Sequence, residues 1–298
     1  MSTAHSGKPI VVGFDGSDTA KLALDWAAAA AHHRRTELHI VHAAGYSSVF
    51  YGPDPIGWAS IHDAQLAEAE HMLDTVAERA RKTAGDLVST DLQDRPAVDV
   101  LVEKSAEASL MVLGQSGLGA FSNMLLGSTT TAVSAHAKCP VLIVRPRRGV
   151  VPDEGPVVVG VDGSQLSEEA LAHAFAEASW RGTSLVAVHS WIDVEHLGPY
   201  LVPTSFEHGT VEQEAHRVLA ERLAGWQEHY PDVEVHRAVE RDRPRHQLLE
   251  RSREAQLVVV GSRGRGGFRG MLLGSTSQAL IHHAECPVMV ARPQPGQG

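Results

Sequence analysis

The sequence contains little cysteine, no long apolar run and no excess of positive charge. Its two cysteines, Cys139 and Cys286, each precede a proline and have no cysteine nearby, so neither a disulfide framework nor a cysteine-based metal site is expected. No apolar run approaches the roughly 18 residues that a membrane-spanning helix needs. A formal net charge of −10 argues against nucleic acid and anionic membranes as the main partners.

The size and overall composition are those of a globular protein. The first residues, MSTAHSGKP, are short and polar, which does not fit a secretory signal. A length of 298 residues, 43% of them hydrophobic and 21% charged, is enough for two domains, each with a sizeable core. We therefore expect a soluble, reduced, cytoplasmic protein.

Two familiar signatures of metal and nucleotide sites are also missing. The eighteen histidines include the adjacent pairs His32-His33 and His282-His283, but neither pair has the i,i+4 spacing of a zinc site. These histidines are expected on the surface, and no metal site is predicted from them. The lysine-bearing phosphate loop GxxxxGK[ST] is absent as well. Any nucleotide site must therefore use another motif.

The sequence does contain a long internal repeat. Four separate matches share one offset of 147 residues, which indicates a tandem duplication without net insertion. The predicted domains are residues 1–147 and 155–294, and the join at 145–156 is rich in proline, glycine and charge, as a linker is. The matches are Gly13–Ser17 with Gly160–Ser164, Val41-His42 with Val188-His189, Gly114 with Gly261, and Cys139 with Cys286.

Within each copy the apolar period alternates between that of a strand and that of a helix. Such alternation predicts the α/β class, with a parallel sheet covered by helices on both faces. In the first copy we expect strands at Lys8–Asp15, Glu37–Ala43, Leu87–Leu92, Leu110–Leu113 and Pro140–Val144. The helices between them are expected at Asp18–Arg34, His62–Lys82, Pro96–Ala106 and Thr129–His136, with a loop over Tyr46–Ser60.

The second copy repeats this pattern. Strands are expected at Val157–Asp162, Ser184–Ser190, Val233–Val239 and Leu257–Val260. Helices are expected at Ser167–Arg181, Val211–His229 and Pro244–Arg253, with a loop from the second strand to about residue 205.

A glycine-rich segment follows the fourth predicted strand of each copy. The segments Leu113–Thr129 and Val260–Thr276 share ten of seventeen residues and the spacing G-x2-G-x9-G-S-T. A strand that ends in such a loop and leads into a helix presents backbone N–H groups and a positive helix end to an anion. Glycine tolerates positive φ and lets an anion approach the backbone closely. The alternative is that the glycines only form a turn, but the duplication favours phosphate binding.

Asp15 and Asp162 are the repeated carboxylates at the end of the first strand of each copy. In a parallel α/β sheet they are expected to share one crevice with the glycine loops, where strand order reverses. Each is predicted to accept a hydrogen bond from a base or sugar. The alternative is that each caps the following helix, although Ser17 and Ser164 are also placed to do so. His42 and His189 end the second strands, where ligand contact and packing both remain open.

Taken together, the aspartate and the glycine spacing resemble the ATP-binding branch of the universal stress protein family, in tandem two-domain form. The resemblance covers essentially the whole chain, and it implies an open five-stranded parallel sheet in the order 3-2-1-4-5. It further implies ATP as the ligand and a role in stress response. Mg²⁺ is expected only as the ion that phosphoryl transfer usually needs, with Ser128 and Ser275 placed to reach it. By resemblance, the base and ribose would contact Gly13, Phe14, Asp15 and Val41 in the first copy and Gly160, Val161, Asp162 and Val188 in the second. The phosphate residues would be Leu113, Gly114, Gly117, Gly127, Ser128 and Thr129, and Val260, Gly261, Arg263, Gly264, Gly274, Ser275 and Thr276.

The copies differ in charge at the loop. The second loop carries Arg263, Arg265 and Arg269, where the first has Ser116, Leu118 and Ser122. Guanidinium groups beside a triphosphate would add charge-assisted hydrogen bonds, so the second site is expected to bind ATP more tightly. The alternative is that these arginines are solvated surface charges.

Three functions remain to be separated. The favoured one is an ATP-binding regulatory protein that acts through conformation or partner binding, with a homodimer and an unknown protein partner expected. The alternative is a slow ATPase or a phosphoryl or nucleotidyl transferase, but no repeated lysine, histidine or glutamate is placed as a base, and no catalytic residue is predicted. A scaffold with vestigial loops is disfavoured by the two intact motifs.

Overall fold

A computed structural model of the protein describes residues 7–45, 55–117, 126–190, 208–241, 243–265 and 272–293. The chain divides into two compact units, Ser2–Val144 and Arg145–Gly298, which we call the N-terminal and C-terminal units. Among the described helices, none is both long and apolar enough to cross a membrane.

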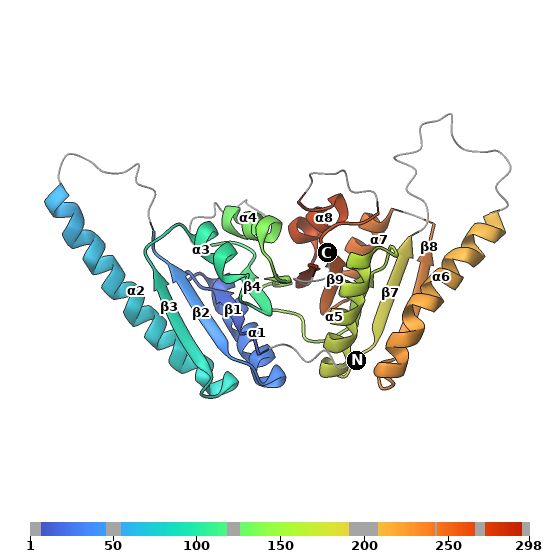
Figure 1. The fold of residues 1–298 in the computed structure, drawn as a ribbon, viewed down its shortest axis with the longest axis horizontal. Helices are drawn as coiled ribbons and strands as arrows, with labels where there is room; N and C mark the ends of the chain where they lie inside the picture. Colours follow the sequence, from blue (N-terminus) through green and yellow to red (C-terminus); the bar gives the residue numbers. More distant parts are fainter. Residues whose placement is uncertain are drawn as a thin grey trace, which may run out of the picture. The chain divides into compact units, whose positions relative to one another are not determined.

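The N-terminal unit has a five-stranded parallel sheet (Figure 1). The strand order is β3-β2-β1-β4-β5, and it confirms the predicted order 3-2-1-4-5. The strands are β1 (Ile10–Gly13), β2 (Leu38–Ala43), β3 (Val88–Gln93), β4 (Leu110–Gly114) and β5 (Val141–Val144). In β1, β4 and β5 nearly every side chain is buried, because both faces of a parallel sheet are covered by helices.

Four helices accompany this sheet, and they pack in pairs. Helix α1 contacts α2, and α3 contacts α4. Their bounds are α1 (Asp18–Arg34), α2 (Pro55–Ala84), α3 (Ala97–Lys104) and α4 (Ser128–His136). Helix α1 begins where the side chain of Ser17 accepts a hydrogen bond from the Ala20 N–H, so the serine supplies the N-cap.

The C-terminal unit repeats the architecture, with strand order β8-β7-β6-β9-β10. Helix α5 packs on α6, and α7 packs on α8. The strands are β6 (Val157–Gly160), β7 (Leu185–Ser190), β8 (Val235–Glu240), β9 (Leu257–Gly261) and β10 (Val288–Ala291). The helices are α5 (Gln165–Arg181), α6 (His208–His229), α7 (Pro244–Arg251) and α8 (Ser275–His283).

Most predicted elements agree with these bounds within two or three residues, but α2 begins much earlier than predicted. It starts at Pro55 rather than His62, so the end of the predicted loop at 46–60 is helical. Proline lacks an N–H and fits the first helical position well, so it marks a helix start here and not an irregular loop. The rest of that loop, 46–54, and the predicted loop at 191–205 lie outside the described residues.

Candidate functional site

The site residues lie where the strand order of each sheet reverses. Strand β1 lies between β2 and β4 and pairs with both. The segments that follow β1 and β4 therefore lie on opposite sides of one crevice. Strands β6, β7 and β9 repeat this arrangement. Asp15 and Asp162 follow the first strands, and Gly114 and Gly261 end β4 and β9. In sheets of this kind ligands bind at this crevice.

Neither aspartate serves as the N-cap of the next helix. Asp15 Oδ1 instead accepts a 3.0 Å hydrogen bond from the backbone N–H of Ser17, and Asp162 Oδ1 accepts one of 2.9 Å from the N–H of Ser164. The side chains of Ser17 and Ser164 provide the caps. Each carboxylate therefore closes a local turn two residues long and still faces the crevice.

Asp162 is also bonded to the glycine loop. Its Oδ2 atom accepts a 2.8 Å hydrogen bond from the backbone N–H of Arg265, and its Oδ1 atom accepts a second bond, of 2.6 Å, from Ser164 Oγ. The Ser167 side chain is a further hydrogen-bond donor to this carboxylate. Burial raises the pKa of Asp162, but the hydrogen bonds from Ser164 and Arg265 outweigh it and hold the pKa below its ordinary value.

The second glycine of each motif lies against this carboxylate. A β-carbon on Gly264 would lie 2.5 Å from Asp162 Oδ2, and one on Gly117 would collide with Asp15 Oδ2. Positive φ is not the reason for glycine here, because no described glycine of either motif has a positive φ. The sequence led us to expect glycine for its tolerance of positive φ. The structure gives a different reason: the aspartate carboxylate occupies the space that a side chain at the glycine would need.

The end of each loop is tied back to its beginning. Gly127 N–H donates to the carbonyl of Gln115, and Gly274 N–H donates to that of Ser262, both at 2.8 Å. Gly127 and Gly274 are the N-caps of α4 and α8, and neither helix has a side-chain cap. The first-turn N–H groups are therefore not taken up by a capping side chain, and Ser128 and Ser275 beside them are exposed. This arrangement suits an anion.

The other end of the crevice is formed mainly by backbone. Phe14 and Val161 are buried, and their N–H groups donate to the carbonyls of Val41 and Val188. These four side chains belong to the core, so only their backbone can serve a ligand. Leu113 and Val260 are likewise buried core residues.

His42 and His189 anchor to this same backbone. The Nδ1 atom of His42 is 2.7 Å from the Phe14 carbonyl, and Nδ1 of His189 is 2.7 Å from the Val161 carbonyl. A carbonyl can only accept, so Nδ1 carries the hydrogen in both rings. The imidazoles therefore stabilise the backbone directly before Asp15 and Asp162. The sequence alone had left open whether these histidines pack or contact a ligand.

The C-terminal unit also contains a pocket of about 320 Å³ beside the glycine loop. Arg263 and Gly264 were predicted as site residues, but the remaining lining residues were not. The wall is formed by Ser164, Gln165, Leu166, Glu169, Arg263, Gly264 and Pro293. A comparison of the two copies would have indicated Glu169 as a candidate site residue, because its equivalent 147 positions earlier is the apolar Leu22.

The loop arginines have different positions. Arg263 is exposed and lines the pocket, whereas Arg265 places its guanidinium over Gly163 and its N–H on Asp162. Arg269, Leu118 and Ser122 lie outside the described residues. Within the described residues, no three histidine, cysteine, aspartate or glutamate side chains gather as metal ligands.

Comparison with known proteins concerns the family of the chain. The family model described as the universal stress protein family matches residues 7–145 and 155–292. Universal stress protein Rv2623 of Mycobacterium tuberculosis is 43% identical over 299 residues, covering 98% of this chain and 99% of that protein. A universal stress protein of Mycolicibacterium smegmatis is 42% identical over 290 residues, covering 96% and 97%.

Among solved structures, a universal stress protein from Archaeoglobus fulgidus superposes with a TM-score of 0.68 at 22% identity, covering 95% of this chain and 98% of that one. At that identity the likeness concerns the fold alone, while the sequence matches concern the family. Two family domains in tandem and close relatives of full length lead to one conclusion: the chain belongs to the universal stress protein family.

Proposed function

We propose that the protein is a cytoplasmic ATP-binding regulatory protein with one nucleotide site in each unit. The observation that supports this most strongly is the contact between the aspartate carboxylate and the second motif glycine, which recurs in both units. It brings the end of the first strand against the glycine loop at the sheet's reversal point. A polar group for the sugar or base and N–H groups for phosphates then lie side by side.

The phosphates are assigned to the loop and to the helix start after it. Gly117, Gly127 and Ser128 would serve in residues 1–147, and Gly264, Gly274 and Ser275 in residues 155–294, which we propose as the two nucleotide-binding domains. Backbone N–H groups at a helix start bind anions through hydrogen bonds and the helix dipole. Thr129 and Thr276, in the first turns of α4 and α8, lie beside the same groups.

The base and ribose are assigned to the backbone at residues 13–15 and 160–162 and to the carboxylates of Asp15 and Asp162. Mg²⁺ would accompany the triphosphate, as it does at most phosphate sites, mainly through phosphate oxygens and water. ATP occupancy would alter the loop conformation and so the surface offered to a second chain or to a protein partner.

The first experiment is to denature the purified protein and identify released nucleotide by chromatography and mass spectrometry, followed by titration of nucleotide-free protein with ATP and Mg²⁺. About two adenine nucleotides per chain are expected. Gly117→Asp and Gly264→Asp should each remove one site, because the new side chain collides with Asp15 or Asp162. Gly225→Asp is the matched control, since Gly225 is exposed on α6 with open space around it. No ATP binding by the parent protein contradicts the proposal.

The same variants compare the two sites. Arg263 and Arg265 add positive charge to the C-terminal loop only, so the site that remains in Gly117→Asp should bind ATP more tightly, and with a steeper salt dependence, than the site that remains in Gly264→Asp. Equal affinities would reject this difference. Size-exclusion chromatography with light scattering, with and without ATP, tests the homodimer.

A further inference from the structure

The pocket of the C-terminal unit contains two oppositely charged side chains that do not bind each other. Glu169 comes from the second turn of α5, and Arg263 comes from the loop after β9. Within the described residues, neither side chain has a hydrogen bond or an ion pair. The neighbouring Glu168, in contrast, pairs with Arg222 at 2.8 Å. Glu169 and Arg263 are thus left available to whatever enters the pocket.

The surroundings of Glu169 suit a base. Leu166 and Pro293 form apolar parts of the same wall, and the carboxyl group is half-buried. Burial raises the pKa of Glu169 above its ordinary value. A carboxylate with a raised pKa is a stronger base than an exposed glutamate.

The pocket also adjoins the proposed phosphate loop, because Gly264 is both a wall residue and the second glycine of the motif. Phosphates held by this loop would therefore lie beside Arg263 and Glu169. The N-terminal unit lacks both groups: Leu22 occupies the position of Glu169, and Ser116 that of Arg263. The two units thus provide an internal comparison.

We propose that the C-terminal unit hydrolyses its bound ATP, with Glu169 as the general base and Arg263 as the stabiliser of the transferred phosphoryl group, while the N-terminal unit holds ATP intact. A water molecule in the pocket gives a proton to the Glu169 carboxylate as its oxygen bonds to the γ-phosphorus. The bond from that phosphorus to the β,γ-bridging oxygen breaks, and the electron pair stays on ADP. The products are ADP and inorganic phosphate.

Arg263 would act on the charge of the reacting group. Its guanidinium donates hydrogen bonds to the γ-phosphoryl oxygens, where charge is spread in the transition state. This step rests on the proposed ATP site, because without ATP on the loop nothing would place a phosphorus atom beside Glu169.

The test uses the full chain carrying Gly117→Asp, so that only the C-terminal site is filled. ATP binding is measured by equilibrium titration, and conversion of [γ-³²P]ATP to phosphate is followed under single-turnover conditions with Mg²⁺. Glu169→Gln should slow hydrolysis roughly 100-fold or more, the usual contribution of a general base, with ATP affinity within about threefold of the parent. Glu169→Asp, which keeps the carboxylate, should recover part of the rate. Glu168→Gln is the matched control and should leave the rate unchanged.

The possible outcomes separate the two proposals. If the parent binds no ATP, the nucleotide site itself is wrong. If ATP binds but no ADP forms, or if Glu169→Gln hydrolyses at the parental rate, the catalytic proposal is overturned while the binding site stands. Equal hydrolysis by the Gly264→Asp protein, which retains only the N-terminal site, overturns it as well.

Discussion

The carboxylate of Asp162 and the backbone N–H of Arg265 are joined by a hydrogen bond of 2.8 Å, although 103 positions separate them in the chain. This bond links the end of β6 to the glycine loop after β9. With the two bonds from Ser164, it makes Asp162 a positioning residue for the loop as well as a candidate ligand contact. The loop conformation therefore depends on the ionised carboxylate.

Asp162→Asn should weaken ATP binding at the C-terminal site and reduce stability in a pH-dependent way. The pKa of Asp162 is lowered by its hydrogen bonds, so the folded state favours the ionised form. That stabilisation is fully present above the unfolded pKa of about 3.9 and is lost as pH falls through the lower folded pKa.

Urea unfolding of both proteins at pH 7 and at pH 3, with ¹³C NMR titration of the carboxyl group, checks this prediction. The stability difference between parent and Asp162→Asn should shrink at pH 3. A difference that stays constant, or a folded pKa at or above 3.9, would contradict it.

Arg145→Ala should strongly destabilise the C-terminal unit. Arg145 is buried, and its guanidinium donates to the carbonyls of Ile281, His282 and Ala284 at 2.8–3.1 Å, which closes the C-terminal end of α8. Burial lowers the pKa of Arg145, but a guanidinium remains charged. Hydrogen bonds to a charged group contribute roughly 1.5–3 kcal/mol each and are not additive, so a loss of about 3 kcal/mol or more is expected.

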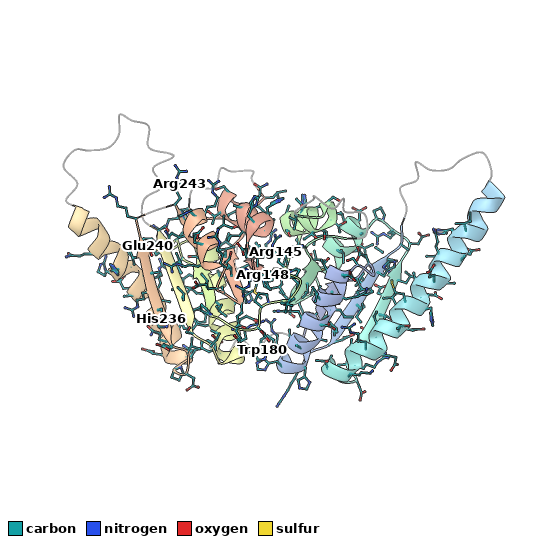
Figure 2. The ribbon with its side chains drawn as sticks, turned by 180° about the vertical axis from the view of Figure 1, so that it is seen from behind. Arg145, Arg148, Trp180, His236, Glu240 and Arg243 are labelled. Carbon is teal, nitrogen blue, oxygen red and sulfur yellow. The ribbon has the colours of Figure 1, made fainter. Side chains whose placement is uncertain are left out.

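Chemical unfolding measures this loss. Arg145→Lys should have a free energy of unfolding between those of the parent and Arg145→Ala, because a single ammonium group cannot reproduce the hydrogen-bond geometry of the planar guanidinium. Arg148→Ala is the control: this residue is exposed, and Figure 2 labels both arginines. An equal loss of stability in Arg145→Ala and Arg148→Ala would contradict the prediction that Arg145 caps the C-terminal end of α8.

Arg35→Gly should stabilise the N-terminal unit by about 0.5–1 kcal/mol. Arg35 ends α1 in the left-handed region at φ 49°, and its counterpart Gly182 ends α5 at φ 61°. Glycine adopts this conformation without the steric cost that a side chain adds. The reciprocal change, Gly182→Ala, should destabilise by a similar amount, although open space surrounds the position.

Thermal unfolding of the two variants checks both signs. Arg34→Gly, one residue earlier inside the helix, is the matched control and should destabilise, since glycine is unfavourable in helical conformation. Stabilisation by Arg34→Gly, or none by Arg35→Gly, would contradict the left-handed explanation.

The sequence by itself determined the repeat, the α/β class, the strand order through the family resemblance, and many local boundaries. Helix α1 covers Asp18–Arg34 as predicted, because its capping serine and its apolar spacing are local signals. The start of α2 was missed, because Pro55 and Gly57 carry loop signals that the helix overrides.

Only the tertiary structure decided what surrounds the motif residues. Gly117 and Asp15 meet across about a hundred positions, and no local pattern shows that a carboxylate fills the space of the missing side chain. The same holds for Glu169 and Arg263, which share a pocket only because α5 packs against β9, the strand that leads into the glycine loop. Local signals select helices and strands, but packing between distant segments decides which side chains share a site.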